Sequence, residues 1–234
     1  MKRILSGITP SGDGSLHLGN YLGAVKQFIT LARDHECFLM VADLHALTTV
    51  QNREQLQKNI ETLILNELAL LLGELSPSTS SGLPNITFFR QSDVPEHTEL
   101  QSILNNVTPL GLLKRAHAYK DKLQKDVMED DINVGLFSYP MLMAADILLY
   151  KTDLVPVGKD QKQHVEITRD IAERFNKTFP VEIGVRPSGT SRPDPVFKLP
   201  EPYIPEQVAV IFGTDGKRKM SKSLGNIISI FETE

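Results

Sequence analysis

Residues 3–20 read RILSGITPSGDGSLHLGN, and this stretch holds the features that decide the fold. The apolar start at Arg3–Ser6 predicts a first strand, and residues 7–15 follow as a turn rich in glycine and hydroxyl side chains. A helix is expected from about Gly19, because apolar residues then recur three or four positions apart along one face. These residues are Leu22, Val25, Phe28 and Ile29. A strand, a turn and a helix in this order are typical of the beginning of an α/β domain.

The rest of the chain continues the alternation of short apolar strands and helical patterns. Further strands are predicted at Cys37–Ala42, Ile86–Phe89, Asp153–Val157 and Val208–Phe212. Helices are predicted at Arg53–Leu72 with Gly73 as its stop, Glu96–Val107, Leu110–Tyr119, Val134–Tyr150 and Gln161–Asn176. Residues 179–205 hold seven of the 14 prolines and are expected to form an irregular connector. The predicted fold class is α/β, with a mostly parallel sheet and helices on both faces.

Composition excludes several classes of protein. The 234 residues are 41% hydrophobic and 23% charged, which is ordinary globular usage. The single cysteine, Cys37, excludes an internal disulfide framework and a multi-cysteine metal site. Because the sequence shows no membrane-length apolar run and no signal-like N-terminus, a cytoplasmic, soluble protein is expected. The net charge of −4 argues against a generally basic nucleic-acid coat but leaves room for a local basic patch.

Two common nucleotide-binding motifs fail in the glycine-rich turn. A Walker loop needs lysine and a hydroxyl residue after its second glycine, but Asp13 and Gly14 follow Gly12. A dinucleotide fingerprint needs a third glycine where His17 stands. From this turn alone, a plain surface loop is as good an interpretation as a phosphate site.

Two other elements point to phosphate binding. His17 stands at the expected start of a helix, where an imidazole N–H and the helix dipole favour an anion. At the other end of the chain, Lys217–Ser223 places four cations within six residues directly after the last predicted strand. Such a run is usually a solvated loop or a nucleic-acid contact. Both elements would nevertheless lie at the carboxyl ends of parallel strands, where open α/β sheets bind ligands.

These residues resemble the two signatures of class I aminoacyl-tRNA synthetases. Leu16–Asn20 resembles the His-Ile-Gly-His signature with asparagine in its last place, and Lys219–Ser223 matches Lys-Met-Ser-Lys-Ser at every position. Between them, Tyr139–Leu148, Val155–His164 and Arg169–Asn176 resemble the tryptophanyl-tRNA synthetase family. The resemblance covers essentially the whole chain. It implies the Rossmann-like parallel-sheet catalytic domain of the class I enzymes.

Some features depart from the family pattern. Thr9 stands where many members have glutamine, Leu5 where some have phenylalanine, and Lys159 where glutamate or arginine is frequent. The loop before His17 is also longer than in some members. The resemblance implies one catalytic domain over residues 1–234, with signature loops at 10–20 and 217–223 and a helical insert at about 93–150. The family's helical C-terminal domain, which reads the anticodon, is expected to be absent from this chain.

The resemblance implies ATP-dependent activation of tryptophan to tryptophanyl-adenylate and pyrophosphate, followed by transfer to tRNA(Trp). It implies that His17, Lys219 and Lys222 act on the ATP phosphates, with Mg²⁺ held mostly by phosphate and water. The implied ATP-binding residues are Thr9, Pro10, Ser11, Gly19, Asn20, Gly158, Lys159, Asp160, Val210, Lys219, Met220, Ser221, Lys222 and Ser223.

Recognition of tryptophan needs a hydrogen-bond acceptor, because indole offers one N–H and no acceptor. Asp146 is a carboxylate in an otherwise apolar helix and therefore needs a partner. The plain alternative is a helix residue that faces solvent or caps a neighbour. The family match implies that Asp146 accepts the indole N–H, that Met143 packs on the ring, and that Tyr139 and Gln161 hold the ammonium group. Further implied lining residues are Leu5, Gly7, His45, Ile147, Val155 and Val157.

Three other kinds of protein share some of these features. A tyrosyl-tRNA synthetase shares the architecture but usually carries a tyrosine on the first strand, where this chain has Leu5 and Gly7. A small nucleotidyltransferase would lack the full Lys219–Ser223 signature, and a non-catalytic paralogue would not need His17 with both lysines. Family membership also implies a homodimer, with the helices around Leu100–Tyr119 and the Tyr139 helix near its interface.

Overall fold

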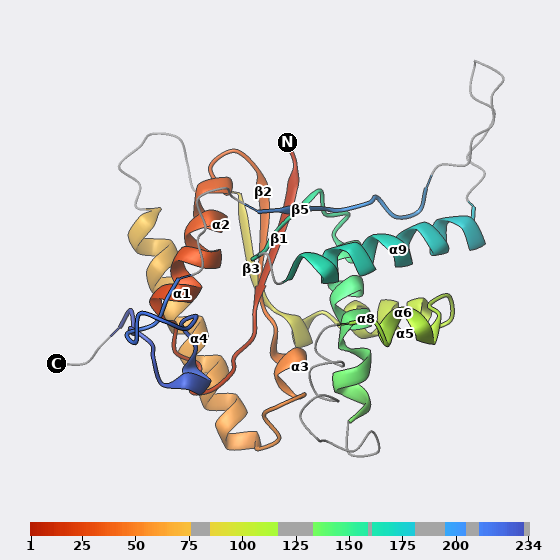
Figure 1. The fold of residues 1–234 in the computed structure, drawn as a ribbon. Coiled ribbons are helices and arrows are strands. Elements are labelled where there is room, and N and C mark those ends of the chain that lie inside the picture. The colour runs from red at the N-terminus through yellow and green to blue at the C-terminus, as the bar shows by residue number, and fades with distance from the viewer. Residues whose placement is uncertain (76–84, 117–132, 159–160, 181–194, 205–210, 232–234) are drawn as a thin grey trace. The chain divides into compact units, whose positions relative to one another are not determined.

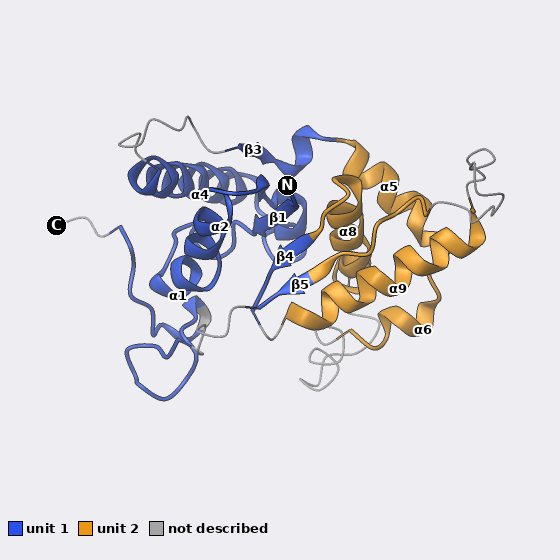
Figure 2. Cartoon of the chain, turned by 90° about the horizontal axis from the view of Figure 1, so that it is seen from above, with its two compact units in different colours: residues 1–94, 154–160, 202–234 blue, residues 95–153, 161–201 orange. Residues whose placement is uncertain are grey.

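The computed structural model describes residues 1–75, 85–116, 133–158, 161–180, 195–204 and 211–231. The chain divides into two compact units, shown in Figure 2. Unit 1 comprises Met1–Val94, Leu154–Asp160 and Pro202–Glu234. Unit 2 comprises Pro95–Asp153 and Gln161–Glu201, so it overlaps the predicted helical insert and also takes in the helix after it.

The sheet has five strands in the order β3-β2-β1-β4-β5 (Figure 1). The strands are β1 Arg3–Ile8, β2 Glu36–Val41, β3 Ile86–Arg90, β4 Leu154–Pro156 and β5 Glu201–Tyr203. The pairs β1–β2, β2–β3 and β1–β4 are parallel. This order is that of the Rossmann-like sheets, in which ligands bind at the carboxyl ends of the strands near the point where the strand order reverses. The predicted α/β class with a parallel sheet is confirmed.

The core of unit 1 lies between the sheet and the helices α2 (Lys26–Leu31) and α4 (Arg53–Glu74). Side chains alternate along β2, so that Cys37, Leu39 and Val41 all face this core and are fully buried. Phe28 of α2 is also fully buried there. Helix α4 presents a stripe of residues four apart, which puts Leu63 and Leu71 into the same core.

The helical stretch after β1 is not uniform. It begins as α1 (Leu18–Asn20), continues as a π-helical segment (Tyr21–Val25) and ends as α2. The start agrees with the prediction from about Gly19. Single π-helical segments within a helix are frequent at functional sites.

Where the structure describes unit 2, it contains four helices. They are α5 (Glu96–Asn105), α6 (Leu110–Leu113), α8 (Val134–Leu149) and α9 (Lys162–Thr178). Leu104, Met141 and Ile171 come from three of these helices and are fully buried in one cluster. Helix α8 continues through Pro140, where proline removes one backbone hydrogen bond.

The structure corrects several predicted elements. Gly73 does not end α4, which runs to Glu74 with Leu75 as its C-cap, because an exposed glycine lowers helix propensity without breaking the helix. The connector predicted at 179–205 contains strand β5. The helix predicted at Leu110–Tyr119 is described only as the short α6. Most of the strand predicted at Val208–Phe212 lies outside the described residues, and Phe212 forms an isolated bridge with Lys219.

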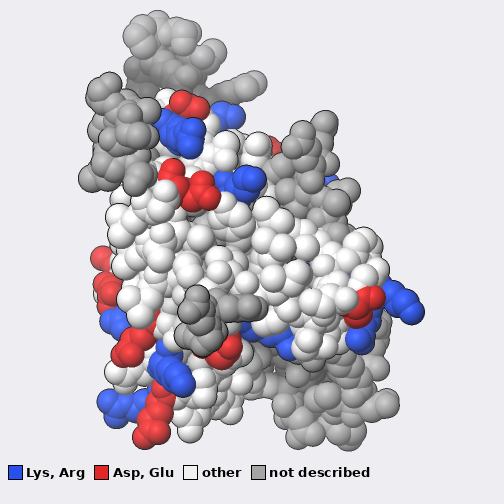
Figure 3. Space-filling model, turned by 90° about the vertical axis from the view of Figure 1, so that its left-hand side faces the viewer, with Lys and Arg blue, Asp and Glu red and all other residues white. Residues whose placement is uncertain are grey.

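Charged side chains are mixed by sign on the face drawn in Figure 3, where the Lys and Arg groups alternate with Asp and Glu groups around uncharged surface. Within the described residues, no helix combines the length and the hydrophobicity that a membrane span requires.

Candidate active site

Unit 1 contains a pocket of about 460 Å³ at the carboxyl end of β1. Its lining comes from both ends of the chain. The lining residues are Ile8, Thr9, Ser11, Gly12, Ser15, Leu16, His17, Asn20, Ser221 and Lys222. Residues separated by about 200 positions therefore meet where an open α/β sheet places its ligand.

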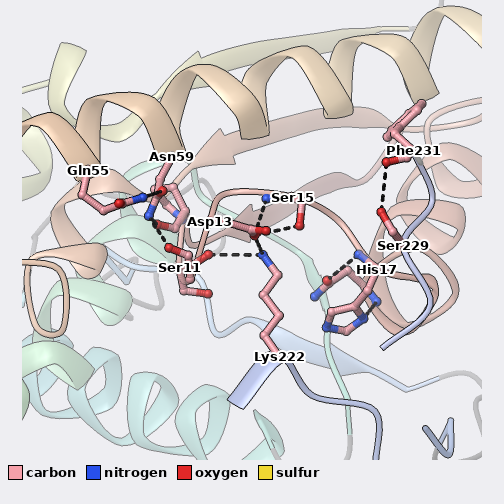
Figure 4. Close-up of polar contacts among 12 residues, drawn as sticks. Ser11, Asp13, Ser15, His17, Gln55, Asn59, Lys222, Ser229 and Phe231 are labelled. Atoms are coloured by element: carbon pink, nitrogen blue, oxygen red, sulfur yellow. Dashed lines mark hydrogen bonds and ion pairs between the residues drawn. The ribbon is translucent and has the colours of Figure 1, made fainter. Parts of the chain in front are cut away.

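The wall formed by residues 10–14 is held by helix α4 (Figure 4). The Asn59 side-chain amide donates to the carbonyl oxygens of Pro10 at 3.2 Å and of Gly12 at 2.9 Å. Gln55 in turn donates to Asn59 Oδ1 at 2.6 Å. Asn59 is fully buried, so these bonds form in a dry environment where each matters more than at the surface.

Gly14 allows the loop to lie directly on α4. Its φ of +79° favours glycine, and an added Cβ would lie 2.3 Å from the Asn59 carbonyl oxygen. Glycine is thus required here both by the backbone conformation and by the close approach of the helix.

His17 and Asn20 lock each other at the start of the helix. The backbone N–H of Asn20 donates to His17 Nδ1 at 3.2 Å, and the backbone N–H of His17 donates to Asn20 Oδ1 at 3.1 Å. Burial, together with the charges of Lys222 and Lys219, lowers the pKa of His17 below its ordinary value of 6.5. A neutral imidazole that accepts at Nδ1 carries its proton on Nε2, so His17 can donate one hydrogen bond there.

The segment after the late basic loop is joined to the stretch around His17. Leu18 N–H donates to the Ile228 carbonyl at 2.9 Å, and Ile230 N–H donates to the Leu16 carbonyl at 3.2 Å. His17 and Ser229 face each other in an antiparallel bridge between these bonds. These contacts fix the end of the late loop beside the pocket.

Residues 211–220 form a small hairpin that carries the basic signature. Its two sides are joined by bonds from Met220 N–H to the Ile211 carbonyl and from Gly213 N–H to the Arg218 carbonyl, both 2.8 Å long. The Asp215 carboxylate accepts the backbone N–H groups of Lys217 and Arg218 at 3.0 Å, and these bonds hold its pKa well below the usual range.

Asn226 connects this hairpin to the turn that bears Lys222. It is 3% exposed, and its Oδ1 accepts the backbone N–H of Ser221 at 2.9 Å. Its Nδ2 donates to the Lys219 carbonyl at 3.3 Å. Sequence reasoning missed both Asn226 and Asn59, because a lone asparagine in a loop or a helix gives no pattern.

Lys222 crosses the pocket to the early loop (Figure 4). Its Nζ lies 2.8 Å from Asp13 Oδ1 and 3.2 Å from the Ser11 carbonyl oxygen. Its stem packs on Gly12, where an added Cβ would lie 2.9 Å from Lys222 Cδ. The ammonium group is therefore held at the pocket wall by one anionic and one neutral acceptor.

Of the predicted ATP-binding residues, the structure gathers Thr9, Ser11, His17, Asn20, Ser221 and Lys222 around this pocket. Pro10 and Met220 are buried beside it in the loops that form it, and Gly19 packs against the His17 ring. Lys219 is exposed on the hairpin and does not line the pocket, and Gly158 follows β4. Lys159, Asp160 and Val210 lie outside the described residues, as does the side chain of Ser223.

The predicted tryptophan-binding residues are distributed over both units. Unit 1 holds Leu5 and Gly7 on β1, His45 on α3 (Asp43–Ala46), and Val155 and Val157 on or after β4. Unit 2 holds Tyr139, Met143, Asp146 and Ile147 on α8, and Gln161 at the N-cap of α9.

Asp146 has the partner that its burial requires. It is 2% exposed, and its Oδ1 lies 2.7 Å from Nδ1 of His97 on α5. The other ring nitrogen of His97 lies 2.9 Å from the Tyr150 hydroxyl. Tyr139 also meets a histidine, since its hydroxyl lies 2.7 Å from Nε2 of His164. Neither histidine was predicted as a partner, because the sequence does not show which helices pack together.

The chemistry available at the pocket is that of anion binding. Among the residues that the structure describes, no three His, Cys, Asp or Glu side chains are grouped so that they could hold a metal ion. The pocket instead offers an ammonium group, an imidazole N–H and hydroxyl groups.

Comparison with known proteins agrees with these features. A family model described as "tRNA synthetases class I (W and Y)" matches residues 1–234. A tryptophan–tRNA ligase of Fusobacterium nucleatum is 50% identical over 234 residues, which are 100% of this chain and 63% of that protein. A crystal structure of tryptophanyl-tRNA synthetase from Campylobacter jejuni matches with a TM-score of 0.77 and 44% identity, over 99% of this chain and 63% of that one.

A second structure of the Campylobacter jejuni protein, complexed with ADP and tryptophan, matches with a TM-score of 0.75 and 45% identity, again over 99% of this chain and 63% of that one. The chain thus spans somewhat less than two thirds of the length of these relatives.

Proposed function

This chain belongs to the class I tRNA synthetases of the W and Y family, and from that premise we propose that it carries the catalytic part of a tryptophan–tRNA ligase. The proposed substrates are L-tryptophan, ATP and tRNA(Trp). One observation carries the proposal. His17 and Lys222, which come from the two signature motifs, line the same pocket.

The proposed reaction has two steps. The tryptophan carboxylate attacks the α-phosphorus of ATP, the bond from that phosphorus to the bridging oxygen breaks, and pyrophosphate leaves. A ribose hydroxyl at the end of the tRNA then attacks the carbonyl carbon of the adenylate, and AMP leaves. Neither step needs a protein nucleophile, so the protein's contribution is to position the substrates and to stabilise charge.

His17 and the lysines are proposed to supply that stabilisation. The neutral His17 ring would donate Nε2–H to a phosphate oxygen, since its Nδ1 is already occupied by Asn20. Lys222 would exchange its contacts with Asp13 and Ser11 for the departing pyrophosphate. Lysine suits this role because its ammonium group is a compact charge on a flexible stem. Lys219, exposed on the hairpin, is proposed to approach the same phosphates when nucleotide is bound.

Magnesium is expected to enter with the nucleotide. The described residues do not form a carboxylate site that would hold it, so we assign no ligand and no step to the metal.

The amino-acid side of the proposal rests on the family match, residue by residue. Asp146 is proposed to accept the indole N–H, and its place on α8 with His97 as partner supports a fixed, ionised acceptor. Met143 is proposed to pack on the ring, and Tyr139 and Gln161 to hold the ammonium group. The remaining proposed tryptophan-lining residues are Leu5, Gly7, His45, Ile147, Val155 and Val157. Gly158, Lys159, Asp160 and Val210 are proposed to meet the ribose or adenine.

We also propose that the protein works as a homodimer in the cytoplasm, as expected from the family. The chain of 234 residues is expected to form the adenylate.

Pyrophosphate exchange into ATP tests the proposal. The chain should catalyse exchange with tryptophan and not with tyrosine, and Lys222→Ala should lower the rate about 100-fold or more, as loss of a transition-state donor does. Lys177→Ala is the matched control, because that lysine is exposed near the end of α9. Exchange with tyrosine but not with tryptophan would show that tyrosine is the substrate. The absence of exchange with either amino acid would refute the proposed function.

A further inference from the structure

The buried group around Asp146 forms a chain of three polar side chains on two helices. Asp146 and Tyr150 are four residues apart at the end of α8, and His97 of α5 lies between them. His97 is fully buried and Asp146 is 2% exposed. A buried polar group of this kind is costly to form unless its members satisfy one another.

The direction of the hydrogen bonds follows from chemistry. Burial, aided by the charges of Asp146 and Glu96, raises the pKa of Tyr150, so its hydroxyl keeps its proton. An ionised carboxylate can only accept, so Nδ1 of His97 carries a proton, and the Tyr150 hydroxyl lies within hydrogen-bond distance of Nε2 on the other side of the ring. Nδ1–H then donates to the Asp146 carboxylate at 2.7 Å. A donated hydrogen bond favours the ionised carboxylate, which can only accept.

We propose that His97 is a positioning residue for substrate specificity: it fixes the Asp146 carboxylate as an oriented acceptor and thereby makes the enzyme select an aromatic amino acid whose ring carries an N–H. The inference rests on the proposed function, in which Asp146 meets the indole. Part of the selectivity for tryptophan then comes from α5, which carries His97, and not from Asp146 on α8 alone. Tyr150 supports the same arrangement by holding the other ring nitrogen of His97.

The test compares tryptophan with an analogue in which sulfur replaces the ring N–H, each measured by pyrophosphate exchange with the 234-residue chain. The parent should prefer tryptophan by about 100-fold or more in kcat/KM, because a site built to hydrogen-bond a group rejects the isostere that lacks it. In His97→Leu, kcat/KM for tryptophan should fall about tenfold or more, mainly through KM, whereas the value for the analogue should change less than about threefold. The preference for tryptophan over the sulfur analogue should therefore be largely lost in His97→Leu.

Two further variants separate positioning from general damage. His97→Asn keeps a donor close to the place of Nδ1 and should restore most of the preference. Tyr150→Phe removes only the hydroxyl and should lower the preference for tryptophan by a smaller factor. If circular dichroism shows that His97→Leu is unfolded, Tyr150→Phe becomes the deciding variant. Equal losses for both substrates, or an unchanged preference in the folded variants, would overturn the inference. A parent that activates neither compound would refute the proposed function, and the inference with it.

Discussion

Replacing Asp13 with asparagine should make the pocket bind pyrophosphate more tightly. In the structure, Lys222 Nζ is bonded to Asp13 Oδ1 at 2.8 Å, so an incoming phosphate has to compete with this carboxylate. Burial alone would raise the pKa of Asp13, but hydrogen bonds from Lys222 and Ser15 outweigh it and hold the pKa well below the usual range. The carboxylate is thus ionised at any pH used for the assay, and Asp13→Asn removes a full charge.

The size of the effect follows from the exposure of the pair. The side chain of Lys222 is 22% exposed and that of Asp13 is 70% exposed, so solvent screens the pair. Ion pairs of this kind contribute about 0.2–1 kcal/mol. The dissociation constant for pyrophosphate should therefore fall about 1.4- to 5-fold in Asp13→Asn. The gain should shrink at high salt, which weakens the exposed pair.

Calorimetric titration of the 234-residue chain with pyrophosphate measures this constant. Asp34→Asn is the matched control, because it removes the same charge from an exposed turn before β2. If competition for Lys222 is the cause, the gain should disappear when Asp13→Asn is made in a Lys222→Ala background. A gain that survives there would mean that Asp13 acts only through long-range repulsion. Weaker binding by Asp13→Asn alone would refute the reasoning outright.

Three further predictions concern stability, measured by urea unfolding. Glu67 is fully buried, neither of its carboxylate oxygens has a hydrogen-bond partner among the described residues, and burial raises its pKa well above 4.5. The free energy of unfolding of the parent should therefore fall relative to that of Glu67→Gln as pH rises above 4.5, by about 1.4 kcal/mol for each unit of the difference in pKa. Parallel stability curves from pH 5 to 8 would contradict this prediction. Asn59→Ala removes the side-chain amide that donates to two loop carbonyl oxygens, so it should lower the free energy of unfolding by about 1–3 kcal/mol. The folded variant should also lose pyrophosphate binding. Gly14→Ala should lower the free energy of unfolding by about 2–5 kcal/mol. Gly216→Ala should lower it much less, because Gly216 has a similar positive φ but open space around it. Equal costs at the two glycines would show that the contact with α4 is unimportant.

The parts of the fold that the sequence predicted are those with a local signal. Apolar periodicity is strong in residues 53–72, and residues 37–42 form a short continuous apolar run, so both elements were predicted to within two residues. His17 and Lys222 were predicted through ordered motifs, and the structure brings both to one pocket. The short strand β5 gave no signal because its pairing depends on a partner far away in the sequence.

The supporting residues of the site could not be predicted for a physical reason. Asn59 and His97 act through partners 47 or more positions away, and only the packing of the elements in three dimensions reveals those partners. Burial of Asp146 did indicate that some partner must exist. It did not indicate which side chain, because any donor on a neighbouring helix would have satisfied the same requirement.

The bonds that residues 228–230 make on either side of His17 bear on how the protein can be divided for experiments. A fragment cut after Gly225 would keep both signature motifs in its sequence but would lose the backbone bonds that hold the last turn beside the His17 ring. Lys222 would then keep its own contacts with Asp13 and Ser11 but would lose the support of Asn226 and of the bonds at Leu16 and Leu18. Anyone trimming this protein to a minimal nucleotide-binding piece should therefore set the boundary beyond Ile230.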